Sequence, residues 1–391
     1  MYPDLSYVFH DLLGTPADNW LSIFKTFGLL VAMAVLSAAR LLYLELKRRS
    51  QIGQFAGTPA KVVSNPPMKP MDYVLNGVFG FFVGFKLLYI IQHVGDMQAD
   101  PSGVLLSGKG SWAGGMAGMV LLLGFYYWQD VQTRKAGIKE EMKMLFPHDR
   151  ITDITTIAVV SGVIGAKLFT VIEQPRAFIA DPVGQLFSGD GWTIYGGLIG
   201  GFIGVYTYLR KKNIAIRPFL DAVAPGLIVS YGVGRMGCHF AGDGDWGIVA
   251  APQPNGWLLP DWLWAYDYPR NVLNEGVKMA SCVGKYCSHL PEGVYPTSVY
   301  ETMMAFTIGG ILWALRKKLT AIPGMLFALY LAFNGLERFW IEKIRVNDRH
   351  EILGGFTQAE FIALILFVIG LGWGIWLWSQ RSPSNNLKSN V

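Results

Sequence analysis

Nine apolar segments, each long enough to cross a lipid bilayer, limit what this chain can fold into. An α-helix needs about 17–25 mostly apolar residues to span the hydrocarbon core. The segments lie at 22–44, 72–92, 112–129, 153–173, 193–209, 217–238, 297–315, 324–342 and 356–379. Only 16% of the 391 residues are charged, against about 25% in soluble domains. We therefore expect an all-α polytopic membrane protein with nine transmembrane helices.

The loops between these segments indicate an orientation. Clusters of Lys and Arg follow the first, third, fifth and seventh segments, at 47–69, 134–150, 210–212 and 316–318. Cytoplasmic loops carry such an excess of basic residues, so we expect the N-terminus outside and the C-terminus inside. Residues 1–24 lack Lys and Arg, so no cleavable signal peptide is expected. The basic loops also explain the net charge of +5, and no nucleic-acid partner is expected.

The connection at 239–296 is too long for a turn, and we expect it to form a small external head. It holds four of the 13 Trp residues, a residue type that favours the membrane boundary. Cys282 and Cys287 lie there with C-x4-C spacing and could pair as a disulfide in an oxidising compartment. A metal site with His289 has less support, because no second Cys/His pair has ligand spacing. The sequence leaves the disulfide open.

An internal repeat joins two pairs of the apolar segments. Twelve of the 27 residues at 84–110 are identical to their counterparts at 165–191, which lie 81 positions later. After a one-residue slip, Gly114–Gly118 aligns with Gly196–Gly200. Gly-rich helices could converge under shared membrane constraints, but a duplicated helical hairpin explains the identities better.

The repeat suggests how the chain is divided. We expect a first helix with its flanking segments, an extra hairpin that is the first repeat copy, a core that contains the second copy and the head, and a cytoplasmic tail. Their boundaries are 1–70, 71–150, 151–380 (second copy at 153–210, head at 239–296) and 381–391.

The stretch Gly234–Gly247 carries an unusual set of residues out of the sixth apolar segment. Four glycines within eleven residues allow tight turns and a close approach of the backbone to a ligand. Arg235 lies inside the apolar segment, where an arginine costs roughly 2.5–3.5 kcal/mol on an insertion scale. This cost indicates that a partner or a ligand compensates the charge.

Polar residues from separate segments fall at one depth, in the outer halves of the predicted helices. They are Lys86, Lys167, Tyr195, Arg235, Tyr300, Glu301, Arg338 and Glu342. Intramembrane ionisable residues are candidates for function, because their cost rarely serves a scaffold. Lys86 is the exception: its repeat copy has Ala113 where the other copy has Tyr195, so we expect Lys86 to be structural.

Arginines dominate this set. Arg338, Glu342 and Arg345 share one helix face, and a self-neutralising pair that closes a helix interface is one explanation. With Arg235 added, two arginines lack two dedicated carboxylates at this level, which favours an anionic ligand such as a phosphate. A phospholipid entering sideways from the outer leaflet fits this set. Cys238 could instead be a nucleophile, although a lone buried cysteine is more often a packing residue.

Five segments carry short motifs in a specific order and spacing. They are Phe27–Leu30 (F-G-L-L), Tyr195–Gly200 (Y-G-G-L-I-G), Gly234–Gly247 (G-R-M-G-C-H-F-A-G-D-G-D-W-G), Pro296–Glu301 (P-T-S-V-Y-E) and Arg338–Asp348 (R-x3-E-x2-R-x2-D). Together they resemble the Y/F-G-L, H-G-G-L-I-G, G-R-x-x-N-F-x-N-G-x-x-W-G, P-S-Q-L-Y-E and R-x3-E-x2-R-x2-D motifs of bacterial prolipoprotein diacylglyceryl transferases. The resemblance covers most of residues 20–380.

This resemblance implies a lipid transferase of the bacterial inner membrane, with its site toward the outer leaflet. The family transfers the diacylglyceryl group of phosphatidylglycerol to the lipobox cysteine thiol of a prolipoprotein, forming a thioether and releasing glycerol phosphate. No metal or cofactor is required. On this reading Arg235 and Arg338 hold the lipid phosphate, and Glu342 orients Arg338. The remaining substrate-site residues are Tyr195, Glu301, His239 and Asp243 on the thiol side, with Gly196, Gly197, Gly247, Tyr300 and Lys167.

Three departures from the family pattern affect the proton acceptor. Tyr195 replaces the family's histidine, and a phenol has a reference pKa near ~10. An inserted residue puts either Cys238 or His239 at the usual Asn position, and Asn334 stands where many members have Tyr. His239 has the more suitable ordinary pKa. The alternatives are a phospholipid-binding relative with changed or absent chemistry, and a lipid transporter or flippase, which the repeat would suit.

Overall fold

The chain is mostly helical. The computed structural model describes residues 1–64, 67–99, 104–105, 108–136, 139–182, 193–347, 349–350 and 355–380. Its helices are α1 (Leu5–Leu13), α2 (Thr26–Gln51), α3 (Pro70–Gln92), α4 (Val94–Ala99), α6 (Trp112–Ala136), α7 (Ile151–Glu173), α8 (Pro175–Ala180), α10 (Ile194–Lys211), α11 (Ile216–Ala241), α12 (Thr297–Leu315), α13 (Met325–Ile341) and α14 (Gln358–Ser379). Three two-stranded sheets pair β1 (Thr58–Ser64) with β2 (Lys139–Leu145), β3 (Val277–Lys278) with β4 (Ser288–His289), and β5 (Arg349–His350) with β6 (Phe356–Thr357).

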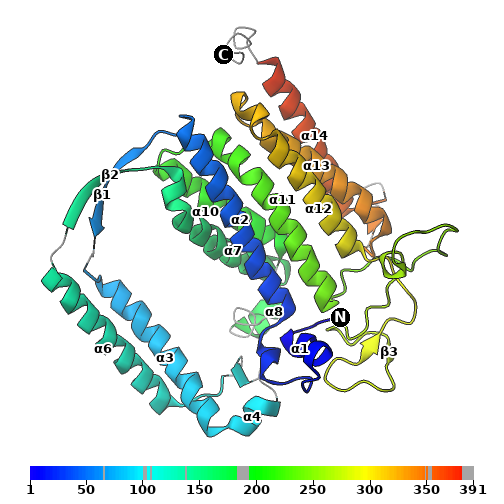
Figure 1. The fold of residues 1–391 in the computed structure, drawn as a ribbon, viewed down its shortest axis with the longest axis horizontal. Helices are drawn as coiled ribbons and strands as arrows, with labels where there is room; N and C mark the ends of the chain where they lie inside the picture. The colour runs from blue at the N-terminus through cyan, green and yellow to red at the C-terminus, as the bar shows by residue number, and fades with distance from the viewer. Residues whose placement is uncertain are drawn as a thin grey trace. The chain divides into compact units, whose positions relative to one another are not determined.

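Each of the nine predicted apolar segments lies on a helix of the described chain (Figure 1). Five helical stretches are long and apolar enough to cross a membrane: α2, α3, α12, α14, and α7 together with the turn before it, Pro147–Glu173. These five identify a polytopic membrane protein. The count of nine transmembrane helices and their orientation stay predictions.

The chain forms two compact units. The first contains Met1–Leu30, Pro59–Met144 and Met236–Pro296, and the second contains Val31–Thr58, Leu145–Arg235 and Thr297–Val391. Each unit holds one of two similar helical hairpins.

The hairpin of α3 and α6 belongs to the first unit, and glycines set its close packing. A Cβ atom on Gly84 would overlap the carbonyl oxygen of Gly114 and lie 2.9 Å from Cα of Gly118. Lys86 donates from Nζ to the backbone carbonyls of Val104 (2.8 Å) and Lys109 (2.9 Å). These bonds give Lys86 the structural role expected for it.

The hairpin of α7 and α10 repeats this packing in the second unit. A Cβ on Gly165 would overlap the carbonyl oxygen of Gly196 and lie 2.9 Å from Cα of Gly200. Gly165 follows Gly84 by 81 positions, while Gly196 and Gly200 follow their counterparts by 82. The one-residue slip in the sequence repeat therefore falls between the two helices of each hairpin, and it leaves the helix contact unchanged.

One hydrophobic core of the second unit lies between α11, α12 and α13. Its buried side chains are Ile228, Ala305, Ile308, Leu312 and Leu326. Helix α14 packs on α13 through a second close contact, in which a Cβ on Gly370 would lie 2.7 Å from the carbonyl oxygen of Ala328. This core fixes the facing surfaces of three helices that carry arginines and glutamates near their ends.

The regular structure described in the head is a short 3₁₀ helix at Asp261–Leu263 and the antiparallel pair of β3 and β4, in which Val277 faces His289. Cys282 and Cys287 form a disulfide, with Cα atoms 5.5 Å apart, which settles the question that the sequence left open. A disulfide has no thiolate to offer a metal, so the metal reading of these two cysteines is wrong. The backbone N–H of Tyr286, inside the disulfide loop, donates to the hydroxyl of Tyr7 in α1 (3.2 Å).

Candidate functional site

Glu301 is the centre of a buried cluster of charges in the second unit. It lies in the first turns of α12, where its carboxylate is fully buried. Oε2 accepts from Nε of Arg235, which lies on α11. Oε1 accepts from Nη1 of Arg338 on α13 (2.9 Å) and from Nη1 of Arg345 (3.3 Å). One carboxylate thus holds three guanidinium groups, all from outside α12 and between 37 and 66 residues away in the sequence.

Glu342 adds a second carboxylate to this cluster. Nη2 of Arg338 lies 3.1 Å from its Oε2, as the four-residue spacing predicts. Its other oxygen accepts from the hydroxyl of Thr357 (3.0 Å) and from the side-chain amide of Asn347. Thr357 also caps the N-terminus of α14, so a residue at the start of α14 helps to hold Glu342.

The expectation that Arg235 and Arg338 lack dedicated carboxylates is therefore wrong. Glu301 contacts both, and Glu342 contacts Arg338. The sequence analysis put Glu301 at the same depth as the arginines but assigned it to the thiol side of the site. In the fold, the first turns of α12 lie beside the last turns of α11 and α13. A guanidinium has five N–H donors, so each arginine retains donors for a further acceptor while the carboxylates hold it in place.

Two polar groups in this region were missed by the sequence analysis. Glu337 is 4% exposed, and neither of its carboxyl oxygens has a hydrogen-bond partner in the described chain. The hydroxyl of Tyr231 is likewise buried without a partner. Both interact electrostatically with Glu301, Arg235 and Arg338. The sequence signal for Glu337 was a second carboxyl directly before Arg338 in an apolar segment, but Glu337 is not part of the family motif.

The residues expected on α7 and α10 also lie in the second unit. Tyr195 is 37% exposed in the first turn of α10, and Lys167 is 9% exposed on α7. The space beside Gly196 is occupied by the backbone of Gly165, so this glycine allows the two helices to pack closely. A Cβ on Gly197 would meet only ordinary contacts, at 3.6 Å and beyond. Its glycine identity has no explanation in the helix contact.

The remaining expected residues divide between the units. Tyr300 precedes Glu301 in the first turns of α12, in the second unit. His239, Asp243 and Gly247 belong to the first unit. Gly247 donates its backbone N–H to the carbonyl of Tyr295 (2.9 Å), inside the head. Asp348, the last residue of the C-terminal motif, lies outside the described residues.

His239 is surrounded by aromatic rings. It is 6% exposed, and its ring centroid lies 5.6–6.1 Å from those of Trp262, Tyr266 and Tyr268. Its Nδ1 lies 3.4 Å from the hydroxyl of Tyr268. Burial raises the pKa of Tyr266 to about 12, so that neighbour remains a neutral phenol. Aromatic side chains of the head thus enclose His239, and its role as a site residue stays a prediction.

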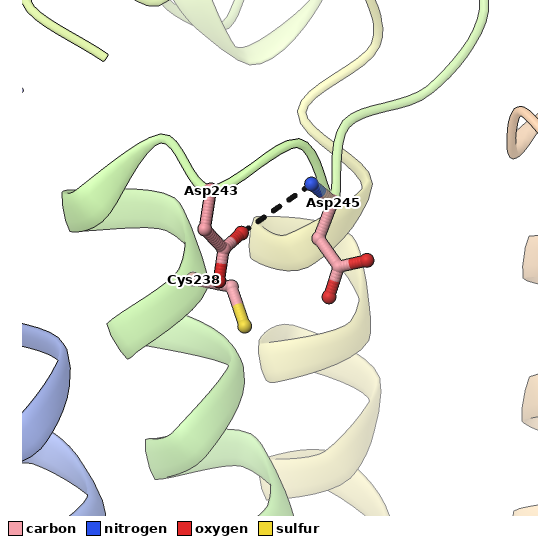
Figure 2. Close-up of side chains that lie close together, drawn as sticks. All are labelled: Cys238, Asp243 and Asp245. Carbon is pink, nitrogen blue, oxygen red and sulfur yellow. Dashed lines mark hydrogen bonds between the residues drawn. The ribbon is translucent and has the colours of Figure 1, made fainter. Parts of the chain in front are cut away.

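Cys238, Asp243 and Asp245 form a compact group where α11 enters the head (Figure 2). Their potential ligand atoms lie within 4.8 Å of one another. Asp243 accepts a hydrogen bond from the backbone N–H of Asp245 (3.3 Å), a turn that the positive φ angles of Gly242 (63°) and Gly244 (96°) permit. A structural zinc site uses four ligands, one more than this group supplies. The geometry accounts for the group as a capped tight turn.

Comparison with known proteins gives one family. The family model described as prolipoprotein diacylglyceryl transferase matches residues 116–376. Similar curated proteins carry the name phosphatidylglycerol–prolipoprotein diacylglyceryl transferase. That of Corynebacterium efficiens is 30% identical over 225 residues, which are 56% of this chain and 66% of the relative. That of Clostridium tetani is 28% identical over 236 residues, 60% of this chain and 83% of the relative. That of Bifidobacterium adolescentis is 33% identical, over 57% of this chain and 64% of the relative. The match to the Corynebacterium protein thus spans just under two thirds of its length.

Proposed function

The chain belongs to the prolipoprotein diacylglyceryl transferase family, and from this premise we propose that it transfers the diacylglyceryl group of phosphatidylglycerol to the lipobox cysteine thiol of a prolipoprotein. The curated relatives carry the name of this activity. The observation that carries the proposal within this chain is the convergence of Arg235, Arg338 and Arg345 on Glu301.

The reaction requires a site that stabilises a developing phosphate charge. The sulfur of the peptide cysteine forms a bond to the terminal glyceryl carbon of the lipid. The bond from that carbon to the phosphate oxygen breaks with its electron pair, and glycerol phosphate leaves. The thiol proton is lost to a base or to the departing phosphate. Donors fixed in advance at the leaving oxygen accelerate such a step, by about 10²–10³-fold for a single donor in other enzymes.

In our proposal Arg235 and Arg338 bind the lipid phosphate. Guanidinium groups match phosphate oxygens in pairs, and the side chain of Arg338 is 28% exposed, which leaves it accessible to a ligand. Glu301 and Glu342 hold the two arginines in place before the lipid arrives. The peptide supplies the nucleophile, so the half-buried Cys238 has no role in the bond changes.

Tyr195 is the position of this chain that departs most from the family pattern. We propose that its hydroxyl contributes to the thiol side of the site, where the family has a histidine. Asp243, Gly247, Tyr300 and Lys167 remain proposed as substrate-site residues. The packing of His239 among aromatic rings favours a structural role for it over a role as base.

We also propose the placement in the membrane. The nine predicted helices cross the bacterial inner membrane with the N-terminus outside, following the basic loops. The arginine cluster then lies at the outer leaflet, where a lipobox peptide is accessible. The extra hairpin at 71–150, the core at 151–380 and the tail at 381–391 are the divisions proposed from the repeat.

A purified-enzyme assay tests the function. The full chain in detergent is incubated with phosphatidylglycerol and a lipobox peptide, and the peptide mass and glycerol phosphate are measured. We expect a diacylglyceryl mass gain that is lost in Arg235→Ala and Arg338→Ala. It should be kept in Arg316→Ala, because Arg316 contacts a different carboxylate of the same unit, that of Glu45 (3.4 Å). Lipid binding without any peptide modification would instead support a relative with absent chemistry. Movement of lipid between leaflets of a vesicle, without product, would support a transporter.

A further inference from the structure

We infer that Tyr231 and Glu337 bind the ester carbonyl groups of the diacylglyceryl moiety and so make the site selective for a diacyl lipid. This inference rests on the proposed function, because it takes the phosphate of the same lipid to lie on Arg235 and Arg338. Nothing in the family match or in the names of the relatives assigns a role to either residue.

The first support is the absence of partners within the described chain. The hydroxyl of Tyr231 and both carboxyl oxygens of Glu337 are buried and make no hydrogen bond. Leaving a buried polar group unsatisfied costs about 1–3 kcal/mol, and more for a charged group. Native proteins keep such groups rarely. Three unsatisfied atoms on two side chains beside one charge cluster therefore indicate a ligand that completes them.

The second support is position along the helices. Tyr231 lies four residues before Arg235 on α11, which is about 6 Å toward the middle of the helix at 1.5 Å per residue. Tyr231 packs against the apolar cluster that contains Ile228 and Leu326. On α13, Tyr330 packs against the same cluster, and it lies about two helical turns before Glu337. The two polar groups thus mark the border between the arginines and the apolar core.

A phospholipid has its polar groups in the same order. When the phosphate lies on the arginines and the acyl chains extend along apolar surface, the two ester groups lie only a few bonds from the phosphate, on the side of the chains. Their carbonyl oxygens are hydrogen-bond acceptors. A site that continues from arginines to isolated O–H groups and then to apolar side chains matches this order.

The balance of charge indicates which form of Glu337 is present. Arg235, Arg338 and Arg345 bring three positive charges. Glu301 and Glu342 neutralise two, and the lipid phosphate neutralises the third. A further buried carboxylate would be uncompensated, which is strongly unfavourable. Glu337 therefore acts as a neutral acid, whose O–H donates to a carbonyl as the Tyr231 hydroxyl does.

The test compares two lipids that differ only at the esters. Wild-type protein is given phosphatidylglycerol with ester-linked chains, or its dialkyl ether counterpart, which has the same headgroup, charge and chain length but no carbonyls. Equilibrium binding to the protein in detergent and kcat/KM with a lipobox peptide are both measured. One net hydrogen bond corresponds to roughly a fivefold change in affinity, so we expect wild type to prefer the ester lipid by about 10–30-fold.

Variants then assign the preference to the pair. Tyr231→Phe and Glu337→Leu should each lower the preference by roughly fivefold, mainly through weaker binding of the ester lipid. Glu337→Gln retains a donor and should keep most of the preference. Tyr208→Phe is the control, since its hydroxyl donates to Asp153 elsewhere in the unit. Glu337→Leu should also leave the melting temperature equal or higher, because an apolar residue replaces an unsatisfied one.

The outcomes are distinct. Equal binding of ester and ether lipids by wild type, or a preference that survives both Tyr231→Phe and Glu337→Leu, overturns the inference. A lower melting temperature in Glu337→Leu with an intact lipid preference would likewise overturn it and make Glu337 purely structural. If wild type forms no lipidated peptide yet binds the ester lipid preferentially through the pair, the transferase proposal fails and the inference about the lipid stands.

Discussion

Two glutamates in the second unit each hold three arginines, yet the surroundings of the two clusters differ. Glu45 on α2 contacts Arg48, Arg49 and Arg316, just as Glu301 contacts its own three arginines. We call these the Glu45 cluster and the Glu301 cluster. Their similar composition makes them a natural comparison for separating structural charges from charges that serve a ligand.

Protein groups hold the Glu45 cluster, although Nη2 of Arg49 and Nε of Arg316 make no hydrogen bond within the described chain. Arg49 donates to the side chain of Gln54 (2.8 Å) and lies 3.6 Å from Asp221. Asp221 in turn accepts from the backbone N–H groups of Gly324 (2.8 Å) and Phe327 (3.0 Å) at the start of α13. Each carboxylate here joins separate elements. The Glu301 cluster has, in addition, a whole carboxyl group beside it, that of Glu337, whose two oxygens both lack a hydrogen bond within the described chain, and we propose that its arginines face the lipid. Buried charges and single unsatisfied arginine nitrogens occur in both clusters, so they do not identify a site; the unpaired carboxyl of Glu337 is the difference.

The largest expected effect comes from removing the central charge of each cluster. Glu45→Gln leaves the fully buried Arg49 without its main carboxylate, and loss of one partner from a buried pair costs about 3–5 kcal/mol of stability. Glu301→Gln should also lower the stability of the lipid-free protein. Its stability should recover when a bound anion replaces the lost negative charge. Melting temperatures are measured with and without glycerol phosphate. Recovery of Glu45→Gln to the same degree as Glu301→Gln would erase the distinction between the clusters.

The next largest effect is the stabilisation of the wild-type protein by bound phosphatidylglycerol. Phosphatidylglycerol that binds only the folded state stabilises it by about 2.7 kcal/mol at a concentration of 100 Kd. This stabilisation should vanish in Arg338→Ala and persist in Arg316→Ala. A zwitterionic lipid of the same chains is the control for general detergent effects. Equal stabilisation of both variants would place the anion site away from the Glu301 cluster.

The sequence predicted the helices well because their signals are local. Apolar runs, basic loops and the spacing of Arg338 and Glu342 lie within single segments, and α13 places that pair 3.1 Å apart. The glycine repeat also carried over to the packing of Gly84 and Gly165. These features depend on residues that are close in the chain or on a strict period.

The shared use of Glu301 could not be predicted, since it depends on how α11, α12 and α13 approach one another. Arg235, Glu301 and Arg338 do come together, as residues expected at one level can, but the sequence did not determine which partner each would have across the interface. The same limit applies to Glu337: its burial and lack of partners are properties of the packed helices. The unsatisfied group therefore appears only in the structure, and there it becomes the strongest pointer to a ligand.

A smaller effect separates charge from geometry in the two clusters. Arg338→Lys keeps the positive charge but loses the planar pair of donors that matches a phosphate, so kcat/KM should fall roughly 10–100-fold, as for the loss of a charged hydrogen bond. Arg316→Lys removes only a structural contact and should keep kcat/KM within about threefold of wild type. The peptide-mass assay with varied phosphatidylglycerol measures both. A similar loss in the two variants would mean that the Glu45 cluster also takes part in catalysis.

The smallest expected effect tests whether the proposed substrate site includes Tyr195 on α10. Two tyrosines lie at opposite ends of this helix: Tyr195 in its first turn, and Tyr208, whose hydroxyl donates to Asp153 (2.7 Å), near its last. Tyr195→Phe should lower kcat by about tenfold, less than the roughly 10²–10⁴-fold typical of a proton-transfer group, because a phenol is a weak base near neutral pH, while Tyr208→Phe should leave kcat unchanged. Tyr195→His, which restores the family residue, should retain or raise activity, because an imidazole is the stronger base near neutral pH. If Tyr195→Phe and Tyr208→Phe are equally active, the thiol side of the site lies away from α10, and the chemistry near the Glu301 cluster depends on the arginines and the substrate alone.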